Sequence, residues 1–162
     1  MKSRVDIVGE FWRAYRDTLP VEHPHHERQR PLAWGFGDSS ALADELGLLT
    51  LSGRKRATAT MLEELIANGE LLPQIGELNI ILDGSEQPLC LIETIDVQVL
   101  PFDQVDEQFA RDEGEGDGSL TYWQDAHTAF FGRVAERLGT TLQPTTPIVC
   151  ERFRLLYPQP DT

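Results

Sequence analysis

Cysteine, cationic side chains and long apolar runs are all scarce in this chain of 162 residues. The two cysteines, Cys90 and Cys150, lie in apolar strand-like segments, so we expect reduced core thiols rather than a disulfide or a metal site. No apolar run is long enough to cross a bilayer, and the first residues lack the apolar core of a signal peptide. We therefore expect a cytoplasmic protein with no membrane partner.

Positive charge is outnumbered, with 14 Lys and Arg against 27 Asp and Glu and a net charge of −13. Residues 1–62 hold nine Lys or Arg and eight Asp or Glu, whereas residues 63–162 hold five and nineteen. Binding to a long nucleic-acid backbone draws on many cations acting together, so we expect no long duplex partner. A nucleoside or a short single-stranded RNA remains as a partner, because such recognition relies on a local pocket and on stacking. The sequence leaves the oligomeric state open.

Much of the positive charge in the first half gathers in one stretch, where Arg54, Lys55 and Arg56 follow Gly53 and precede Thr58. A solvated helix end is one interpretation of this cluster. A lysine beside a hydroxyl can also act as base and nucleophile, or hold a polar ligand. Residues three apart lie together on a helix but on opposite sides of a strand. Lys55 and Thr58 can therefore cooperate only if the chain between them turns.

Hydrophobic periodicity and capping residues predict both helices and strands. The helices are expected at residues 5–19, 39–53, 61–68, 101–109 and 119–138, and the strands at 78–82, 88–100 and 148–157. In the first helix Val5, Val8, Trp12, Tyr15 and Leu19 recur at helical spacing and are most simply core residues. The order of elements suits an α+β domain built on a curved or closed, barrel-like sheet with flanking helices.

Two ionisable residues interrupt apolar faces. Glu93 stands among the odd-numbered positions of the strand 88–100, which are otherwise apolar. A buried carboxylate needs a partner, so an ion pair with an arginine is the first interpretation and a catalytic role the second. His127 lies on the apolar stripe of the helix 119–138, where a satisfied core histidine is commoner than a catalyst.

Two other clusters are candidates for metal binding. His23, His25 and His26 share a polar loop but have no second cluster at ligand spacing. The acidic, glycine-rich residues 111–118 do not have the spacing of an EF-hand. We therefore expect no metal and no cofactor.

Taken together, the motifs resemble those of ASCH-domain proteins. The residues from Gly53 to Thr58 resemble the Gly-x-Lys-x-x-Thr signature of that family. Further similar motifs are Phe36-Gly-Asp38, Pro88 to Val97, Pro101-Phe102, Glu113 to Trp123, His127 and Phe130-Phe131. The resemblance implies a PUA-like β-barrel fold associated with RNA over residues 34–157. An N-terminal helix and polar loop, 1–33, would precede this domain, and a tail, 158–162, would follow it.

The resemblance also implies a chemistry. Smaller relatives include amidohydrolases that remove the acyl group of N4-acetylcytidine with a Lys, a Thr and a Glu, which by motif position are Lys55, Thr58 and Glu113. In that scheme Lys55 takes the proton of Thr58, Thr58 attacks the acyl carbonyl, and Glu113 protonates the leaving amine. The scheme requires Lys55 to be partly removed from water. Two features depart from the small relatives: Thr60 stands where they often carry Arg, and an acidic, glycine-rich insertion follows Glu113.

Nine further residues are expected to contact the substrate alongside Lys55, Thr58 and Glu113. They are Trp34, Phe36, Arg54, Arg56, Glu93, Ser119, Tyr122, Trp123 and His127. Two alternatives to amide hydrolysis stay open. A ribonuclease would use Lys55 to stabilise the phosphorane, with Ser119 or Tyr122 positioning the phosphate. A binding module would hold a modified base against aromatic rings without any chemistry.

Overall fold

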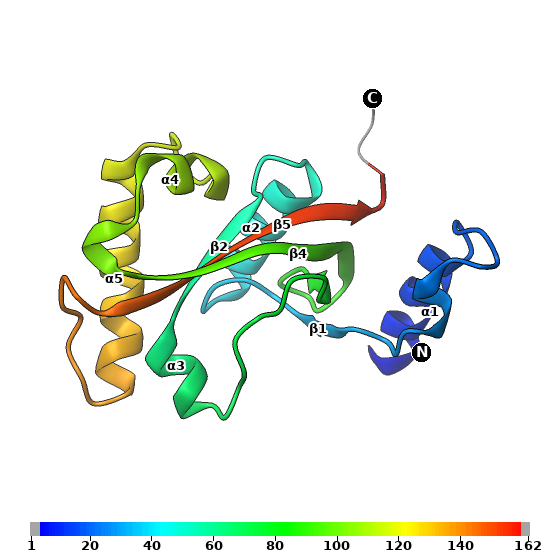
Figure 1. Ribbon diagram of the computed structural model, residues 1–162, viewed down its shortest axis with the longest axis horizontal. Helices are drawn as coiled ribbons and strands as arrows, with labels where there is room; N and C mark the ends of the chain where they lie inside the picture. The colour runs from blue at the N-terminus through cyan, green and yellow to red at the C-terminus, as the bar shows by residue number, and fades with distance from the viewer. Residues whose placement is uncertain (1–3, 160–162) are drawn as a thin grey trace. The chain divides into compact units, whose positions relative to one another are not determined.

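The computed structural model describes residues 4–159, with side chains from residue 6 onward (Figure 1). Residues 160–162 of the expected tail and the side chain of Val5 lie outside the described residues. The elements in chain order are α1 (Arg4–Arg16), η1 (Pro24–Glu27), β1 (Leu32–Trp34), α2 (Ser40–Leu51), β2 (Ala57–Met61), α3 (Leu62–Ala67), β3 (Leu78–Leu82), β4 (Pro88–Pro101), η2 (Phe102–Gln104), α4 (Glu107–Glu113), α5 (Leu120–Arg137) and β5 (Pro147–Tyr157). Among the described helices, none has the length and apolar character needed to span a membrane.

The strands form one five-stranded sheet in the order β1-β3-β4-β5-β2. β1 runs parallel to β3, β3 pairs antiparallel with β4, and β2 pairs antiparallel with β5. The edges of the sheet are β1 and β2, so it is open within the described part of the chain. The chain divides into two compact units, and the long strands β4 and β5 each contribute to both.

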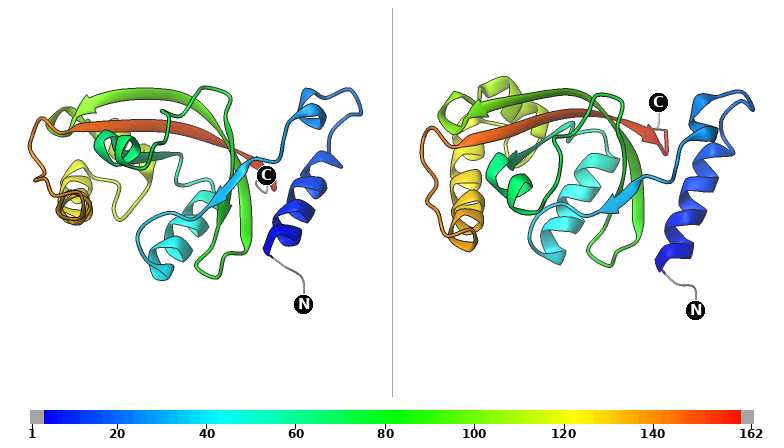
Figure 2. Two further views of the ribbon diagram at one scale, coloured as in Figure 1. Left: turned by 90° about the horizontal axis from the view of Figure 1, so that it is seen from below. Right: turned by 60° about the horizontal axis from the view of Figure 1, so that its bottom comes forward.

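Unit 1 comprises residues 4–53, 78–93 and 154–159. After α1 the chain reverses direction through η1 before it enters β1 (Figure 2). The apolar face of α1 is buried, as the sequence predicted, and packs with residues of β3 and β4. The buried residues of this core are Val8, Trp12, Tyr15, Leu78, Ile80, Leu82 and Leu91.

Unit 2 comprises residues 54–77 and 94–153 and contains β2, α3, α4 and α5. Its core joins one face of the β2/β5 pair to α4 and α5. The buried residues are Ala57, Met61, Val105, Phe109, Ala110, Trp123, Phe131, Val134, Ala135, Ile148 and Cys150. Ser119 caps α5, since its hydroxyl accepts a hydrogen bond from the backbone N–H of Tyr122 at 3.1 Å. The predicted stripe of α5 is therefore a core face.

The bounds predicted for the helix at 101–109 are wrong. Residues Phe102–Gln104 form the short 3-10 helix η2, and α4 begins only after Asp106. The carboxylate of Asp106 accepts a hydrogen bond from the backbone N–H of Phe109 at 2.9 Å and so caps the new helix. The helix then continues to Glu113, which the sequence had assigned to the acidic loop. This difference matters because it fixes Glu113 on a helix end.

The apolar face predicted at the odd-numbered positions of residues 88–100 is observed only in part. Cys90, Leu91 and Ile92 are buried in succession, which is typical of a strand covered on both faces. Farther along β4, Ile95 and Val99 are 48% and 42% exposed. The odd-numbered positions therefore do not form one continuous core face.

Candidate active site

The site lies within unit 2 and begins with the segment between α2 and β2. The backbone N–H of Arg56 donates to the carbonyl of Asp112 on α4 at 2.7 Å, and the carbonyl of Arg56 accepts from the N–H of Phe153 on β5 at 3.0 Å. These two bonds fix the backbone next to Lys55 between a helix end and a strand. Residues 54–56 have no regular structure, and β2 begins at Ala57.

The side chain of Lys55 is buried, with a relative exposure of 1%. Its Nζ donates to the carbonyl of Ala57 at 2.8 Å and to Oε1 of Glu113 at 3.2 Å. The nearer carboxylate oxygen of Glu115 lies 3.8 Å from the same nitrogen. The Ala57 carbonyl belongs to the peptide group that leads into Thr58, so the amine is folded back against the backbone of Thr58. Lys55 is thereby removed from solvent, as the hydrolytic scheme requires.

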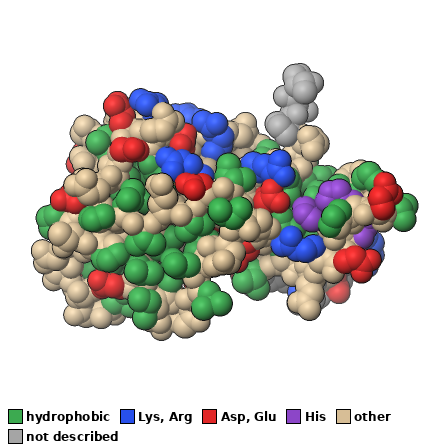
Figure 3. Space-filling view, in the orientation of Figure 1, with side chains coloured by type: hydrophobic (Ala, Val, Ile, Leu, Met, Phe, Trp, Pro, Cys, Tyr) green, Lys and Arg blue, Asp and Glu red, His purple; other side chains and the backbone are tan. Residues whose placement is uncertain are grey.

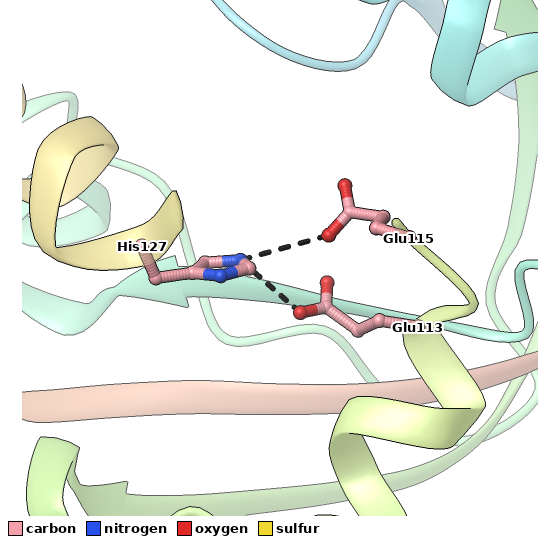
Figure 4. A group of neighbouring side chains, drawn as sticks. All are labelled: Glu113, Glu115 and His127. Carbon is pink, nitrogen blue, oxygen red and sulfur yellow. Dashed lines mark ion pairs between the residues drawn. The ribbon is translucent and has the colours of Figure 1, made fainter. Parts of the chain in front are cut away.

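Glu113 receives hydrogen bonds on both of its oxygens. Its Oε1 faces Lys55, while its Oε2 accepts from the indole N–H of Trp123 and lies 3.1 Å from Nε2 of His127. Burying an unpaired carboxylate would be costly, and these three donors offset that cost. Figure 4 shows Glu113 at the end of α4 and Glu115 in the loop beyond it, both facing the ring of His127 from α5.

The hydrogen bonds of His127 define its protonation. Nδ1 lies 2.8 Å from the carbonyl oxygen of Trp123, which only accepts, so this nitrogen carries a proton. Nε2 faces the carboxylates of Glu113 and Glu115 at 3.1 and 3.9 Å, and a hydrogen bond to them needs a second proton. A charged imidazolium satisfies all of these contacts. The buried cluster then balances two cations, Lys55 and His127, against two carboxylates.

The pKa values of the cluster shift in keeping with this pairing. Burial alone would raise the pKa of Glu113, but the charges of Lys55 and His127, with hydrogen bonds from His127 and Trp123, lower it. Burial alone would lower the pKa of His127, but Glu113 and then Glu115 raise it. Glu113 is therefore held as a carboxylate at neutral pH.

The raised pKa of His127 makes the stability of the protein depend on pH. The contribution of the charged imidazole is fully present below its ordinary pKa of 6.5 and is lost as the pH rises through its value in the folded protein. We therefore expect His127→Gln to reduce the free energy of unfolding most at or below pH 6, and less as the pH rises toward 9. Urea unfolding of both proteins across this range measures the difference. A difference that stays constant with pH would show that His127 is neutral in the folded state.

Gly114 ends α4 in a left-handed conformation, with φ of +68°. A Cβ at this position would collide with the backbone carbonyl of Arg54, so the close approach of the helix end to the segment before Lys55 requires glycine. We expect Gly114→Ala to reduce the free energy of unfolding by about 2–4 kcal/mol, through backbone strain and overpacking together.

Gly118 provides the matched control for Gly114. Its φ is +77°, but no atom lies within 4 Å of a Cβ built on it. Gly118→Ala should therefore cost only about 1 kcal/mol, for the left-handed backbone alone. Chemical denaturation of the two variants tests the comparison, and equal losses would refute the close contact between Gly114 and Arg54.

Thr58 lies on β2, half-buried, directly opposite Glu151 of β5. Within residues 4–159 its hydroxyl takes part in no side-chain hydrogen bond. Ala57 and Arg152 form the neighbouring pair, and Ala57 belongs to the core beneath α4 and α5. Since side chains alternate along a strand, Thr58 and Glu151 point to the other face of the sheet.

Other predicted site residues of unit 2 surround the cluster. Arg54 donates to the carbonyl of Gly116 at 2.6 Å, and the ring of Tyr122, 40% exposed, packs against the same glycine. Arg56 is exposed and lies 3.5 Å from a carboxylate oxygen of Asp112. We call Arg54, Gly116 and Tyr122 the rim of the site. Ser119 serves as the cap of α5, and the indole of Trp123 is buried against Glu113.

Three predicted site residues belong to unit 1. The indole N–H of Trp34 donates to Asn79 at 2.8 Å, and the rings of Trp34 and Phe36 pack edge to face with centroids 5.0 Å apart. Glu93 accepts a hydrogen bond from Nε of Arg154 at 2.7 Å. The first interpretation of Glu93, an ion pair with an arginine, is therefore confirmed.

Glu115, Thr94 and Glu151 are polar residues of unit 2 that the sequence argument did not select. Glu115 contributes a second carboxylate near Lys55 and His127. The hydroxyl of Thr94 donates to Oε2 of Glu151 at 2.6 Å, and both residues are buried. Glu151 was detectable, because it interrupts the alternating apolar positions Val149 and Phe153 of its strand just as Glu93 does in β4.

A metal site at this cluster would use Glu113, Glu115 and His127, whose ligand atoms lie within 4.8 Å of one another. The ammonium of Lys55 already faces both carboxylates at 3.2 and 3.8 Å. A metal ion would have to displace this ammonium and the proton on Nε2 of His127. The donor set therefore fits the internal ion pairs better than it fits a metal.

Charges on the surface are mixed in sign. On the face seen in Figure 3, Lys and Arg side chains lie next to acidic ones. In unit 2, Nε of Arg152 binds Asp112 at 2.9 Å, and its Nη1 lies 3.5 Å from Asp96. Basic and acidic side chains are therefore interspersed on this face.

The sheet topology and the buried lysine–glutamate pair together define an α+β domain of the PUA-like class. The chain belongs to the ASCH domain family, whose model matches residues 32–157. Members of this family are generally associated with RNA binding. No curated protein matches the chain.

Two solved structures are similar to this chain. A crystal structure of an ASCH domain from Lactobacillus crispatus has 32% sequence identity and a TM-score of 0.84, and the match covers 97% of this chain and 96% of that one. A crystal structure of a protein from Enterococcus faecalis has 35% identity and a TM-score of 0.81, with 94% and 91% covered. The predicted family and fold class are therefore confirmed.

Proposed function

We propose that this protein hydrolyses the amide of an N4-acylated cytidine, either as a nucleoside or as an exposed base of RNA. The observation that carries the proposal is the contact between Nζ of Lys55 and Glu113 at 3.2 Å, with side chains that are 1% and 2% exposed. The same amine is folded back on the peptide that leads into Thr58. In the proposal Lys55 is the base, Thr58 the nucleophile and Glu113 the carboxylate that exchanges a proton with Lys55.

Lys55 and Glu113 act as one proton-transfer pair. In the resting protein they are an ammonium and a carboxylate, in accord with the lowered pKa of Glu113. Transfer of one proton along their hydrogen bond gives a neutral amine, held against the peptide between Ala57 and Thr58, and a neutral carboxylic acid. Because the pKa of Glu113 is lowered, this transfer is uphill in the resting protein.

The reaction then proceeds in two halves. The amine of Lys55 accepts the hydroxyl proton of Thr58 while the Thr58 oxygen bonds to the acyl carbon. The bond from the acyl carbon to N4 breaks, and N4 takes up a proton from an acid of the site, which recovers it from the water that attacks in the second half. Water next attacks the acyl ester of Thr58, the ester oxygen recovers its proton from Lys55, and Lys55 recovers its own from Glu113. The products are cytidine and a carboxylic acid.

The rim supplies contacts for the substrate. Tyr122 is 40% exposed and offers an aromatic face on which a base can stack. Arg54 and Arg56 are exposed cations on the segment that carries Lys55. In our proposal Tyr122 stacks on the pyrimidine and the arginines contact the sugar or a neighbouring phosphate.

The test is incubation of the purified protein with N4-acetylcytidine and, separately, with a short unstructured RNA, both followed by chromatography. We expect release of cytidine and acetate with the RNA left intact, and no release with Lys55→Met. Shortened RNA without deacylation would favour the ribonuclease and overturn the proposal. Binding of both compounds without any product would favour the binding module instead.

The burial of Lys55 favours amide hydrolysis over RNA cleavage. A ribonuclease would need the ammonium to contact a phosphate, but its donors already face Ala57, Glu113 and Glu115. A proton-transfer role needs no contact with a phosphate, and the hydrogen bond from Lys55 to Glu113 already offers a path for a proton. Amide hydrolysis therefore fits the buried amine better than phosphoryl chemistry does.

A further inference from the structure

The amide hydrolysis proposed above needs an acid for the leaving amine, and Glu113 is poorly suited to supply it. Both of its oxygens already accept hydrogen bonds, and its lowered pKa holds it as a carboxylate. Its proton exchange is also committed to Lys55. A second carboxyl group with the opposite character would complete the site.

The position of Glu151 next to Thr58 makes it the candidate for this second carboxyl group. It is the direct partner of Thr58 in the antiparallel pairing of β2 with β5. Directly opposed residues of such a pair point to the same face, with Cβ atoms about 4.5–5.5 Å apart. The carboxyl of Glu151 and the hydroxyl of Thr58 therefore project from the sheet side by side.

The surroundings of Glu151 differ from those of Glu113. Glu151 is 8% exposed, and among the described residues the one side chain that donates a hydrogen bond to it is the neutral hydroxyl of Thr94, at 2.6 Å. In the part of the chain that the structure describes, it forms no ion pair with Lys, Arg or His. With the hydroxyl of Thr94 donating to Oε2, we assign the proton of the neutral carboxyl group to Oε1.

The electrostatics agree with this geometry. Burial is the main cause that raises the pKa of Glu151, and the nearby charge of Glu77 raises it further. The hydrogen bond from Thr94 and the charge of Lys55 act in the other direction without cancelling the shift. Two carboxyl groups whose pKa values are moved apart are the usual arrangement for an acid and a base. The charge of Lys55 acts on both Glu113 and Glu151.

We propose that Glu151 is the catalytic acid that protonates the leaving N4 amine when the tetrahedral adduct on Thr58 collapses. The assignment rests on the proposed amide hydrolysis. The proton passes from Oε1 of Glu151 to N4 as the bond between the acyl carbon and N4 breaks, which leaves a carboxylate. The water that attacks the acyl ester of Thr58 then gives its proton back to this carboxylate, and the cycle closes.

The test compares two substrates with the variant Glu151→Gln. The glutamine keeps an oxygen that accepts from Thr94 but cannot donate a proton to a leaving amine. N4-acetylcytidine needs that proton, whereas 4-nitrophenyl acetate does not, because nitrophenolate is a stable leaving group. We expect the variant to lose about 10²-fold or more of its amide turnover, a typical general-acid effect, and to keep ester turnover within about threefold. The ester reaction also reports that the variant is folded.

Glu77→Gln provides a second readout, because Glu77 is exposed and its charge raises the pKa of Glu151. In the wild type, amide turnover should fall as the pH rises through the pKa of Glu151, and this decline should begin at lower pH in Glu77→Gln. The ester reaction should not share that shift.

The outcomes separate the two proposals. Wild-type protein without any amide turnover would overturn the proposed function and this assignment together. Active wild type with Glu151→Gln unchanged on N4-acetylcytidine would overturn this assignment alone. Equal losses on the amide and the ester would also overturn it, because a structural role would affect both.

Discussion

Thr58→Ala is expected to lower the turnover of N4-acetylcytidine by about 10³-fold or more, while the free energy of unfolding changes by less than about 1 kcal/mol. The loss in turnover follows because the substitution removes the attacking oxygen. The fold should tolerate it because Thr58 is half-buried and its hydroxyl forms no side-chain hydrogen bond within residues 4–159. Steady-state kinetics and urea unfolding measure the two effects separately.

Thr60→Ala is the matched control. Thr60 lies on the same strand, also half-buried, and two residues beyond Thr58 it points to the same face. It is paired with Val149 rather than with Glu151. Turnover by Thr60→Ala should stay within about threefold of the wild type. Equal losses in the two variants would show that the strand, and not one hydroxyl, limits the reaction.

The second large effect concerns stability. Lys55→Met and Glu113→Gln should each lower the free energy of unfolding by about 3–5 kcal/mol, because each removes one member of the buried ion-pair cluster and leaves the remaining charges unbalanced. The double variant should lose less than the sum of the two single losses by at least about 1 kcal/mol, since the shared interaction is removed only once. Chemical denaturation of the wild type, the two single variants and the double variant gives this double-mutant cycle.

The pair Arg154 and Glu93 serves as the control for this cycle. It has a shorter contact, 2.7 Å, but the arginine is 61% exposed. Solvent screens such a pair, so its coupling should be below about 1 kcal/mol. If the effects of Lys55→Met and Glu113→Gln simply add, the two side chains do not form the interacting buried pair on which the proposed proton transfer depends.

The contact between Lys55 and Glu113 shows what the sequence supplied and what it did not. Resemblance to the family selected both residues, Lys55 through the Gly-x-Lys-x-x-Thr pattern and Glu113 through its motif position. Their spatial contact joins positions 58 residues apart, which no local periodicity encodes. It depends on the end of α4, where the predicted bounds were wrong because the cap at Asp106 was overlooked.

Glu115 and Glu151 were missed for different reasons. Glu115 stands in a glycine-rich acidic segment, a composition typical of a solvated loop. In the structure its carboxylate nevertheless lies within 4 Å of Lys55 and His127. Glu151 carried a visible signal, since the rule that selected Glu93 applies equally to a glutamate between Val149 and Phe153. The register that sets it opposite Thr58 required the strand pairing itself.

Cytidine release from N4-acetylcytidine by the wild-type protein, measured over many turnovers by chromatography, is the most direct test of the account. We expect cytidine and acetate in equal amounts, in large excess over the protein, and neither product above background with Thr58→Ala. Absence of release by folded wild-type protein, or undiminished release by Thr58→Ala, would contradict the assignment of this site to amide hydrolysis.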